Sequence, residues 1–265
     1  MMLSFIVLNY RTPHHLRICC DYLTQLNLPF EYEIIVVDNN SGDTSLEAIA
    51  AYDQVKVIAN TENSGHAVGN NIGIKQAQGK YLLIVNPDIM IKSSDDIAVM
   101  VAYMESHEKT AILGPKLVNP DGSVQYSCYR QYSLLTPIYR RTFLGSLPWA
   151  KRDINRHLMT DFNHDETRAV DWVLGACMLM RSEVIHSIGG FSEDFFLYFA
   201  DYELCDRVRQ AGFDVVYFHD TKQIIHYHQR QSAARRFSVF QAVSYLTRRH
   251  MMDWWVYLQK RNVNR

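Results

Sequence analysis

The feature that most constrains the fold is a regular alternation of short apolar runs with longer helical patterns in the first 90 or so residues. Each apolar run is continuous, which is typical of strands buried on both faces of a parallel sheet. We predict strands at Leu3–Leu8, Glu33–Val37, Val55–Ala59 and Tyr81–Val85. The sequence therefore predicts an α/β fold with a single mixed, mostly parallel sheet flanked by helices.

The second half of the chain is less regular. We expect a strand with a glycine break over Val170–Arg181, a helix over Tyr202–Gln210, and strands over Asp214–Phe218 and Gln223–Tyr227. Residues 129–168 are rich in Tyr, Arg, His and Asp and show weak periodicity. A long loop is predicted there, of the kind that often carries a binding function.

Length and composition exclude several classes of protein. A chain of 265 residues is near the upper limit for one hydrophobic core, and its formal charge of -1 gives no general attraction to nucleic acid. The five cysteines form no C-x-x-C pair, which argues against a zinc site and a disulfide framework and fits a reducing compartment. No signal peptide and no apolar run of about 20 residues is found, so we expect a cytoplasmic protein.

Polar residues follow three of the predicted strands. These segments are Asn9-Tyr10-Arg11, Asp38-Asn39-Asn40-Ser41 and Asn86-Pro87-Asp88. Ligands bind at the carboxyl ends of such strands, so we expect these segments to lie at one edge of the sheet and to form a site.

A segment rich in glycine and asparagine, residues 60–73, follows the third predicted strand. It suits a tight turn that opens a helix, with backbone N–H groups available to an anion. Taken singly, each of these polar segments also fits an ordinary turn or helix cap.

Six motifs, taken together, resemble those of the inverting family 2 glycosyltransferases, and most closely the bacterial rhamnosyltransferase-like branch. They are Val-Leu-Asn-Tyr-Arg, Val-Val-Asp-Asn-Asn-Ser, Asn-x-Gly-x-x-x-Gly-x-Asn, Asn-Pro-Asp, Gly-Ala-Cys-Met-Leu-Met-Arg and Gly-Gly-Phe-x-Glu-Asp-Phe-Phe-Leu-Tyr. The resemblance runs from residue 3 to about residue 232. It implies a nucleotide-sugar-binding GT-A fold in residues 1–228, with residues 129–168 on the acceptor side.

The activity implied by the resemblance is metal-dependent, inverting sugar transfer from a nucleotide diphosphate donor. The first candidate for the donor is dTDP-rhamnose. The acceptor would be a hydroxyl of a glycan or polyprenol-linked glycan in cell-surface polysaccharide synthesis. Asp38 would accept a hydrogen bond from the base or ribose. The residues expected to bind the nucleotide are Asn9, Tyr10, Arg11, Asp38, Asn40, Asn63, Gly65, His66, Gly69, Asn70 and Asn86.

The resemblance also implies a divalent cation, Mg²⁺ or Mn²⁺. Asn86-Pro87-Asp88 stands where the wider family has Asp-x-Asp, so Asp88 is the one acidic ligand there and Asn86 replaces the other. A hard cation takes oxygen ligands and bridges phosphates, which would neutralise charge on the departing diphosphate. His226 is the expected second ligand, and His228 is the alternative.

Asp201 is the predicted general base, which would remove the proton of the attacking acceptor hydroxyl. The family usually shows Glu-Asp at this point, whereas this chain has Ala200-Asp201. Asp201 also fits the N-cap of a helix, and the two roles are compatible. The residues expected to contact the acceptor or donor sugar are Trp172, Gly175, Ala176 and Glu203.

Residues 229–265 are predicted to form a basic, aromatic helical extension. Between Lys222 and Arg265 there are nine basic residues and one acid, Asp253, so this segment carries +8 and the remainder -9. Apolar residues recur at helical spacing: Phe237, Phe240, Val243, Leu246, Trp254, Trp255 and Leu258. Such a helix either lies on the anionic inner face of the cytoplasmic membrane or packs on the core or a partner chain, as in a homodimer.

Two other classes share part of this pattern. A nucleotidyltransferase on a similar sheet should begin with a Gly-rich loop and an Arg after the first strand, where this chain has Asn9-Tyr10-Arg11-Thr12-Pro13. A degenerate nucleotide-sugar-binding or scaffold subunit would keep the nucleotide site without turnover, and Ala200 is the residue that supports it.

Overall fold

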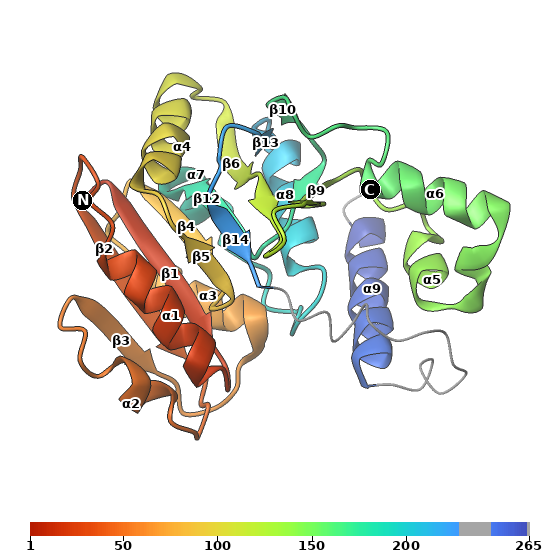
Figure 1. Ribbon diagram of the computed structural model, residues 1–265. Helices are drawn as coiled ribbons and strands as arrows, with labels where there is room; N and C mark the ends of the chain where they lie inside the picture. Colours follow the sequence, from red (N-terminus) through yellow and green to blue (C-terminus); the bar gives the residue numbers. More distant parts are fainter. Residues whose placement is uncertain (228–244, 264–265) are drawn as a thin grey trace.

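The computed structural model describes residues 1–227 and 245–263, and its centre is an eight-stranded sheet (Figure 1). In order across the sheet, the strands are β10 (Arg168–Ala169), β13 (Asp214–Phe218), β6 (Thr110–Pro115), β12 (Cys177–Arg181), β4 (Tyr81–Val85), β1 (Leu3–Asn9), β2 (Tyr32–Asp38) and β3 (Val55–Ala59). Strands β4, β1, β2 and β3 are parallel, and β13 is parallel to β6. The predicted α/β fold with a mostly parallel main sheet is confirmed.

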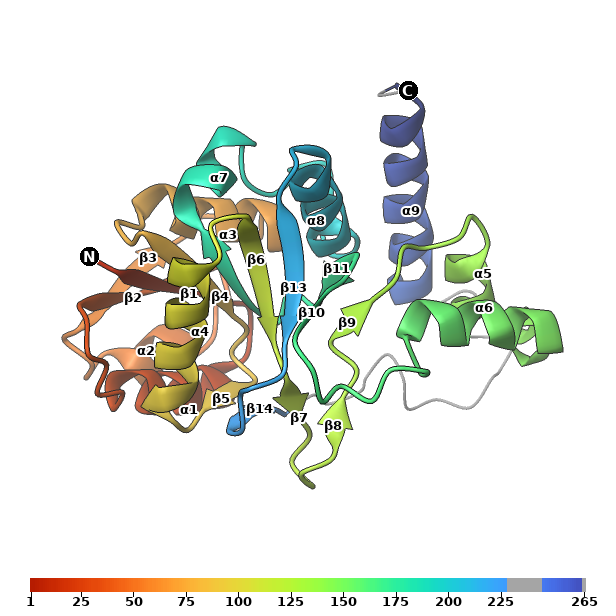
Figure 2. The ribbon, with the colours of Figure 1, turned by 90° about the horizontal axis from the view of Figure 1, so that it is seen from above.

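Helices cover both faces of this sheet (Figure 2). On one face lie α1 (Pro13–Thr24), α2 (Ser45–Ile49) and α4 (Ser94–Ser106); on the other lie α3 (Gly65–Gln76), α7 (Ser182–Ser187) and α8 (Ala200–Gln210). Successive strand residues point to opposite faces, so each continuous apolar strand supplies both cores. In β1, for example, Phe5 is buried with α1 and Ile6 is buried with α3.

The registers of the parallel strands align their carboxyl ends. Asn9 at the end of β1 pairs with Asp38 at the end of β2, and Val7 pairs with Val85 at the end of β4. The polar segments that follow these strands therefore lie at one edge of the sheet, as expected from the sequence.

Two small sheets stand beside the main one. The first contains β5 (Ile89–Ile91), β14 (Ile224–His226), β7 (Leu117–Val118) and β8 (Val124–Gln125); the second pairs β9 (Cys128–Tyr129) with β11 (Trp172–Val173). The strand expected over Val170–Arg181 is thus two strands in different sheets. Residues 174–176 separate β11 from β12 and form part of the wall of a cleft.

The long loop predicted over residues 129–168 is wrong. The segment contains α5 (Thr136–Arg141), the 3₁₀ helix η1 (Phe143–Ser146) and α6 (Pro148–Leu158). A proline lies in the first turn of both α-helices, where its missing N–H is not needed. These elements are short and bury few side chains, with only Ala150 and His157 buried in α6 and none in η1, so the sequence carries little of the apolar period used for prediction.

Helix α9 (Tyr245–Val263) packs against the body of the fold next to α5 and α8 (Figure 1). Trp254 and Tyr257 are both buried, whereas Trp255 is 61% exposed. The burial of Trp254 therefore agrees with packing of this helix on the core, which was one of the alternatives to a place on the membrane surface. Among the predicted apolar positions, Phe237, Phe240 and Val243 lie outside the described residues, and the side chain of Leu246 is likewise not described. Within residues 1–227 and 245–263, no helix is long and apolar enough to cross a bilayer.

Removing the buried tryptophan of α9 should destabilise the protein strongly. Trp254→Ala should lower the free energy of unfolding by about 3 kcal/mol, because it leaves a large cavity. Trp255→Ala, one residue further along the same helix, should change it by less than about 0.5 kcal/mol, since its ring is exposed. Urea denaturation of both variants measures the difference, and equal losses would contradict the packing described for α9.

Candidate active site

A cleft lies where β1 and β4 end and β12 begins. It consists of two adjoining pockets that share His66, Asn86, Asp88 and Leu197. We call the pocket on the β1 side the donor-side pocket, because residues predicted to bind the donor nucleotide line it, and the one next to β12 the acceptor-side pocket, because the predicted base Asp201 lines it.

Several residues predicted to bind the nucleotide line the donor-side pocket. They are Tyr10, Asn63, Gly65, His66 and Asn86. The Tyr10 ring is 40% exposed and carries the guanidinium of Arg11 at 5.2 Å from its centroid. This wall combines an accessible aromatic face with amide groups, which are suited to stacking and hydrogen bonding with a nucleoside.

Asp38 and Asn9 lie buried behind this pocket and do not line it. Asp38 accepts hydrogen bonds from Asn9 Nδ2 at 2.7 Å and from Ser41 Oγ at 2.5 Å. Ser41 Oγ in turn accepts from the backbone N–H of Arg11 at 2.9 Å. The network therefore ties the ends of β1 and β2 together. Asn40 is exposed and also lines neither pocket.

The expectation that backbone N–H groups at the start of α3 are available to an anion is wrong. The N–H of His66 donates to the carbonyl of Phe196 at 2.6 Å, and that of Gly65 donates to Asn63 Oδ1 at 3.0 Å. Gly65 has φ +82°, and a Cβ there would lie 2.6 Å from the Phe196 oxygen. Glycine is needed for this close approach of two segments.

Asn39 is a site residue that the sequence reasoning missed. Its Nδ2 donates to Asn63 Oδ1 at 2.9 Å, and its Oδ1 accepts from Ser64 N at 3.1 Å. It is buried and lines the donor-side pocket. Its place in the Asp-Asn-Asn-Ser segment is a usable signal, although the predicted nucleotide-binding residue of that segment is the neighbouring Asn40.

Gly69 and Asn70 lie inside α3 and line neither pocket. A Cβ on Gly69 would meet the Leu8 side chain at 2.5 Å, so this glycine lets the helix approach β1. Asn70 Nδ2 donates to the His66 carbonyl at 2.9 Å. Both residues therefore serve packing rather than direct contact with a ligand in the cleft.

Asp88 and His226 meet at the junction of the two pockets. Asp88 Oδ2 lies 3.3 Å from His226 Nε2, and His226 Nδ1 lies 2.9 Å from Gln125 Oε1. The backbone N–H of Tyr227 donates to the Asp88 carbonyl at 2.8 Å, which joins the turn after β4 to the end of β14. His228 lies outside the described residues.

These two side chains fit a divalent cation that is shared with a diphosphate. When Gln125 accepts from Nδ1–H, the Nε2 lone pair faces Asp88, which is the arrangement of an imidazole metal ligand held by an outer partner. No group of three or more His, Cys, Asp or Glu gathers among the described residues. Mg²⁺ is typically held by one or two carboxylates with the remaining ligands from phosphates and water.

Asp201 lies in the first turn of α8 and lines the acceptor-side pocket. Its Oδ2 accepts from the backbone N–H of Gly175 at 3.1 Å, and its Oδ1 accepts from that of Tyr202 at 2.8 Å. Gly175 and Ala176, both predicted site residues, line the same pocket. Two backbone donors thus fix the carboxylate in the wall of the cleft.

Phe199, two residues before Asp201, has an uncommon backbone conformation. Its φ is +65°, which is strained for a bulky side chain, and such strain clusters at functional sites. The Phe199 ring lies 4.9 Å from that of His250 and 5.3 Å from that of Trp254, both on α9. The backbone N–H of Tyr198 donates to Asp253 Oδ2 at 3.0 Å. Helix α9 therefore positions the segment that carries Asp201.

Burial raises the pKa of Asp201, and the two backbone N–H donors and His66 only partly oppose this effect. Burial also lowers the pKa of His66, which keeps its imidazole neutral near pH 7. A carboxylate base works only when deprotonated, so activity is present above its pKa and is lost as the pH falls through it. The acid limb of kcat/KM should therefore lie above the ordinary Asp pKa of about 3.9. A pH profile measures this, and a limb at or below that value would contradict it.

Trp172 lies in the wall of the acceptor-side pocket but is mostly occupied by packing. Its ring stacks on Tyr129 at 4.2 Å between centroids, and its Nε1 donates to the Arg130 carbonyl at 3.3 Å. It is 5% exposed, so only an edge is open to a sugar.

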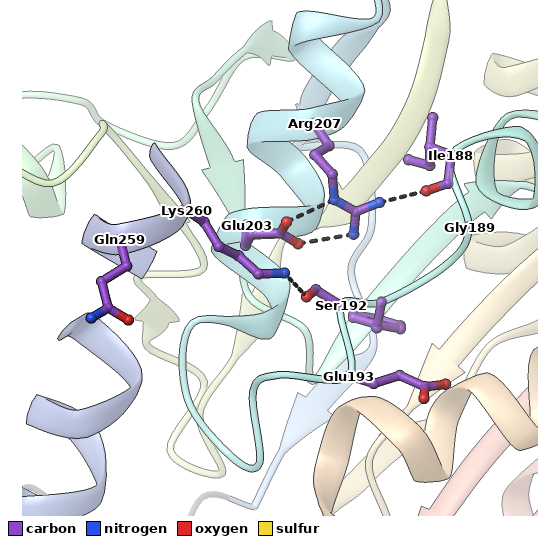
Figure 3. Close-up of a pocket in the computed structure, with 9 residues that line it drawn as sticks. Ile188, Gly189, Ser192, Glu193, Glu203, Arg207, Gln259 and Lys260 are labelled. Carbon is purple, nitrogen blue, oxygen red and sulfur yellow. Dashed lines mark hydrogen bonds and ion pairs between the residues drawn. The ribbon is translucent and has the colours of Figure 1, made fainter. Parts of the chain in front are cut away.

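Glu203 does not belong to the cleft, and the prediction that it contacts a sugar is wrong. Figure 3 shows it in a separate pocket, facing Arg207 and near Lys260 of α9. It accepts from Arg207 Nε at 2.8 Å and from Nη2 at 2.9 Å. Residues two apart on a helix point to nearly opposite sides, so Glu203 and Asp201 cannot line one pocket.

The fold resembles those of solved glycosyltransferases. One is a mannosyltransferase from Pyrobaculum calidifontis in complex with GDP-Man and Mn²⁺, which shares 16% identity and a TM-score of 0.58. The alignment covers 87% of this chain and 58% of that one. The likeness thus shows that the chain has the GT-A fold.

The sequence profile of Glycosyl transferase family 2 matches residues 4–189, and the chain belongs to this family. It is similar to N-acetylglucosaminyl-diphospho-decaprenol L-rhamnosyltransferase of Mycobacterium tuberculosis, with 26% identity over 88% of this chain and 78% of the relative. It is also similar to the rhamnosyltransferase WbbL of Escherichia coli, with 26% identity over 87% and 88%. The chain therefore resembles the rhamnosyltransferase-like branch, as the motifs predicted.

Proposed function

We propose that this enzyme transfers rhamnose from dTDP-rhamnose, with inversion and with a divalent cation, to a hydroxyl of a lipid-linked glycan. The observation that carries the proposal is the placement of Asp201 and of the Asp88–His226 pair in the wall of one pocket. A base and a cation site on one cleft can serve both halves of an inverting displacement. The base would take the proton of the acceptor hydroxyl, and Asp88 and His226 would hold a cation whose charge would stabilise the departing diphosphate.

The chain's own residues would divide the work as follows. Tyr10 and Asn63 would hold the nucleoside, with Asn39 fixing the Asn63 amide by the hydrogen bond described above. Asp88 and His226 would hold the cation, which neutralises the diphosphate when bound. Asp201 Oδ would remove the proton of the acceptor hydroxyl as its oxygen forms the new bond to C1, and the bond from C1 to the diphosphate breaks.

The choice of sugar and acceptor is supported by the relatives. The mycobacterial relative is named for rhamnosyl transfer onto an N-acetylglucosaminyl-diphospho-lipid, and the relative from E. coli is named a rhamnosyltransferase. We therefore propose an N-acetylglucosaminyl-diphospho-lipid as the acceptor in cell-surface polysaccharide synthesis.

A transfer assay tests this proposal. Purified enzyme is incubated with Mg²⁺ or Mn²⁺, a GlcNAc-diphospho-alkyl acceptor, and either dTDP-rhamnose, UDP-glucose or GDP-mannose, and products are separated by mass spectrometry. We expect product from dTDP-rhamnose. Product only from another donor would replace the sugar assignment, and a protein that no nucleoside diphosphate stabilises in a thermal-shift screen would overturn the proposal as a whole.

We also propose that the enzyme contacts the cytoplasmic membrane from its inner face through residues 229–265. The basic charge of this segment and the exposed ring of Trp255 support the proposal. Trp255→Ala should weaken co-sedimentation with vesicles that contain phosphatidylglycerol by about three- to tenfold, since one interfacial aromatic is lost. Vesicles of phosphatidylcholine alone are the control, and equal binding to both kinds would contradict an electrostatic contact.

A further inference from the structure

The acceptor-side pocket contains three nitrogen-bearing side chains that the mechanism above does not use. Arg140 and Arg141 come from the last turn of α5, and His250 comes from α9, which contacts α5 (Figure 1). Within residues 1–227 and 245–263, neither arginine is in an ion pair. Residues 228–244 contain no Asp or Glu, so that segment offers no carboxylate to either of them.

The aromatic side chains that contact the two guanidinium groups are neutral. Arg140 Nη1 donates to the Tyr132 hydroxyl at 3.3 Å and lies 3.2 Å from His157 Nε2. The Arg141 guanidinium lies over the Tyr198 ring, 5.6 Å from its centroid. Burial lowers the pKa of Arg141, and the charge of Arg140 acts in the same direction. Two neighbouring cations without a carboxylate are stabilised when an anion binds between them.

His250 adds an independent observation. It is 5% exposed, it lines the pocket, and its Nδ1 has no hydrogen-bond partner among the described residues. Burial, together with the charges of Arg141 and Arg140, lowers the pKa of His250 to about 3, so the ring is neutral and carries one N–H. A buried polar atom without a partner is uncommon in a folded protein, so the His250 ring has a hydrogen-bonding position that no described residue uses.

We propose that Arg140, Arg141 and His250 form a subsite for the phosphate groups of the acceptor. This proposal rests on the proposed function, because it assigns the second substrate of that same cleft. The pocket is acidic at Asp201 and basic at the arginines. An acceptor sugar would therefore place its hydroxyl at Asp201 and the diphosphate that links it to the lipid at the arginines. A neutral glycoside would leave both guanidinium groups without an anion.

Binding measurements without donor and without divalent cation test the subsite directly. The probes are GlcNAc joined through a diphosphate to an octyl chain, and octyl GlcNAc without phosphate, titrated in EDTA. We expect the wild type to bind the diphosphate compound at least about tenfold more tightly than the neutral one. Arg140→Gln and His250→Phe should each lose about fivefold or more of that preference, and Arg141→Lys, which keeps the charge, should lose less than Arg141→Gln.

The control is Arg152→Gln on α6, an exposed arginine outside the cleft, which should bind like the wild type. Unchanged binding of the diphosphate compound by Arg140→Gln and Arg141→Gln would overturn the subsite, as would an equal loss for the neutral compound. Weaker binding of dTDP-rhamnose by these variants would assign the arginines to the donor and would also overturn it.

The transfer assay separates this proposal from the proposed function. Arginine-dependent binding without transfer from any nucleotide donor would leave the subsite standing and overturn the function. Transfer by Arg140→Gln onto the diphosphate acceptor, with the same KM for that acceptor as the wild type, would leave the proposed function standing and overturn the subsite.

Discussion

Asp201→Asn is expected to lower kcat for sugar transfer by about a thousandfold, within the range that a general base contributes. Asparagine is close in size to aspartate, and its amide oxygen can still accept from the backbone N–H of Gly175, which lies 3.1 Å from the carboxylate. It cannot remove a proton from the acceptor hydroxyl. The Kd for the nucleotide diphosphate should stay unchanged, since Asp201 lines only the acceptor-side pocket.

Asp206→Asn is the matched control for this variant. Asp206 lies on the same helix, outside the cleft, and accepts from the Tyr257 hydroxyl at 3.2 Å. It should retain transfer close to that of the wild type. Steady-state assays on both proteins measure the difference. Full activity in Asp201→Asn would remove the base assignment and leave the base to another group of the pocket.

Asp88→Ala is the second substitution with a large expected effect. It removes the carboxylate that lies 3.3 Å from His226 Nε2, and with it the acidic ligand of the expected cation. A cation at the departing diphosphate contributes several kcal/mol, so kcat should fall by about 10²- to 10³-fold. EDTA should inactivate the wild type, and Mn²⁺ or Mg²⁺ should restore it, whereas Asp88→Ala should respond to neither.

The exposed Asp95→Asn, in the first turn of α4, controls for the loss of one negative charge. It should keep the metal response of the wild type. A wild type that is equally active in EDTA, together with an active Asp88→Ala, would contradict metal dependence.

The fold and the donor side of the cleft were predictable because their signals are local. A continuous apolar run predicts a buried strand, and the polar residue that ends it marks the edge of the sheet where ligands bind. Asn86 and Asp88 were found in this way, and both line the cleft. This reasoning reaches its limit at Asn39, because the prediction names the neighbouring Asn40 instead. Only the backbone geometry, with φ +58° at Asn40, decides which asparagine points inward.

The acceptor side was less predictable because it is assembled from distant segments. Arg140 and His250 are 110 positions apart and belong to no motif that the sequence analysis used. They line one pocket because α9 lies next to α5, and α9 is held on the core by the contacts of Trp254 with Phe199 and of Tyr257 with Tyr202. The sequence alone, in contrast, could have separated Glu203 from the cleft, since two residues span about half a helical turn and Glu203 therefore points away from Asp201.

Strand β12 bears on whether the two sides of the cleft can move relative to each other. It is hydrogen-bonded to β4 on one side and to β6 on the other, so the strand ends that border the two pockets belong to one uninterrupted sheet. The donor-side wall at the end of β1 and the part of the acceptor-side wall at the start of β12 are two strands apart, and each interval is fixed at about 4.8 Å by the backbone hydrogen bonds. These strand ends would therefore keep their spacing when the substrates bind, whereas the helices that complete the acceptor-side pocket are not held by the hydrogen bonds of that sheet.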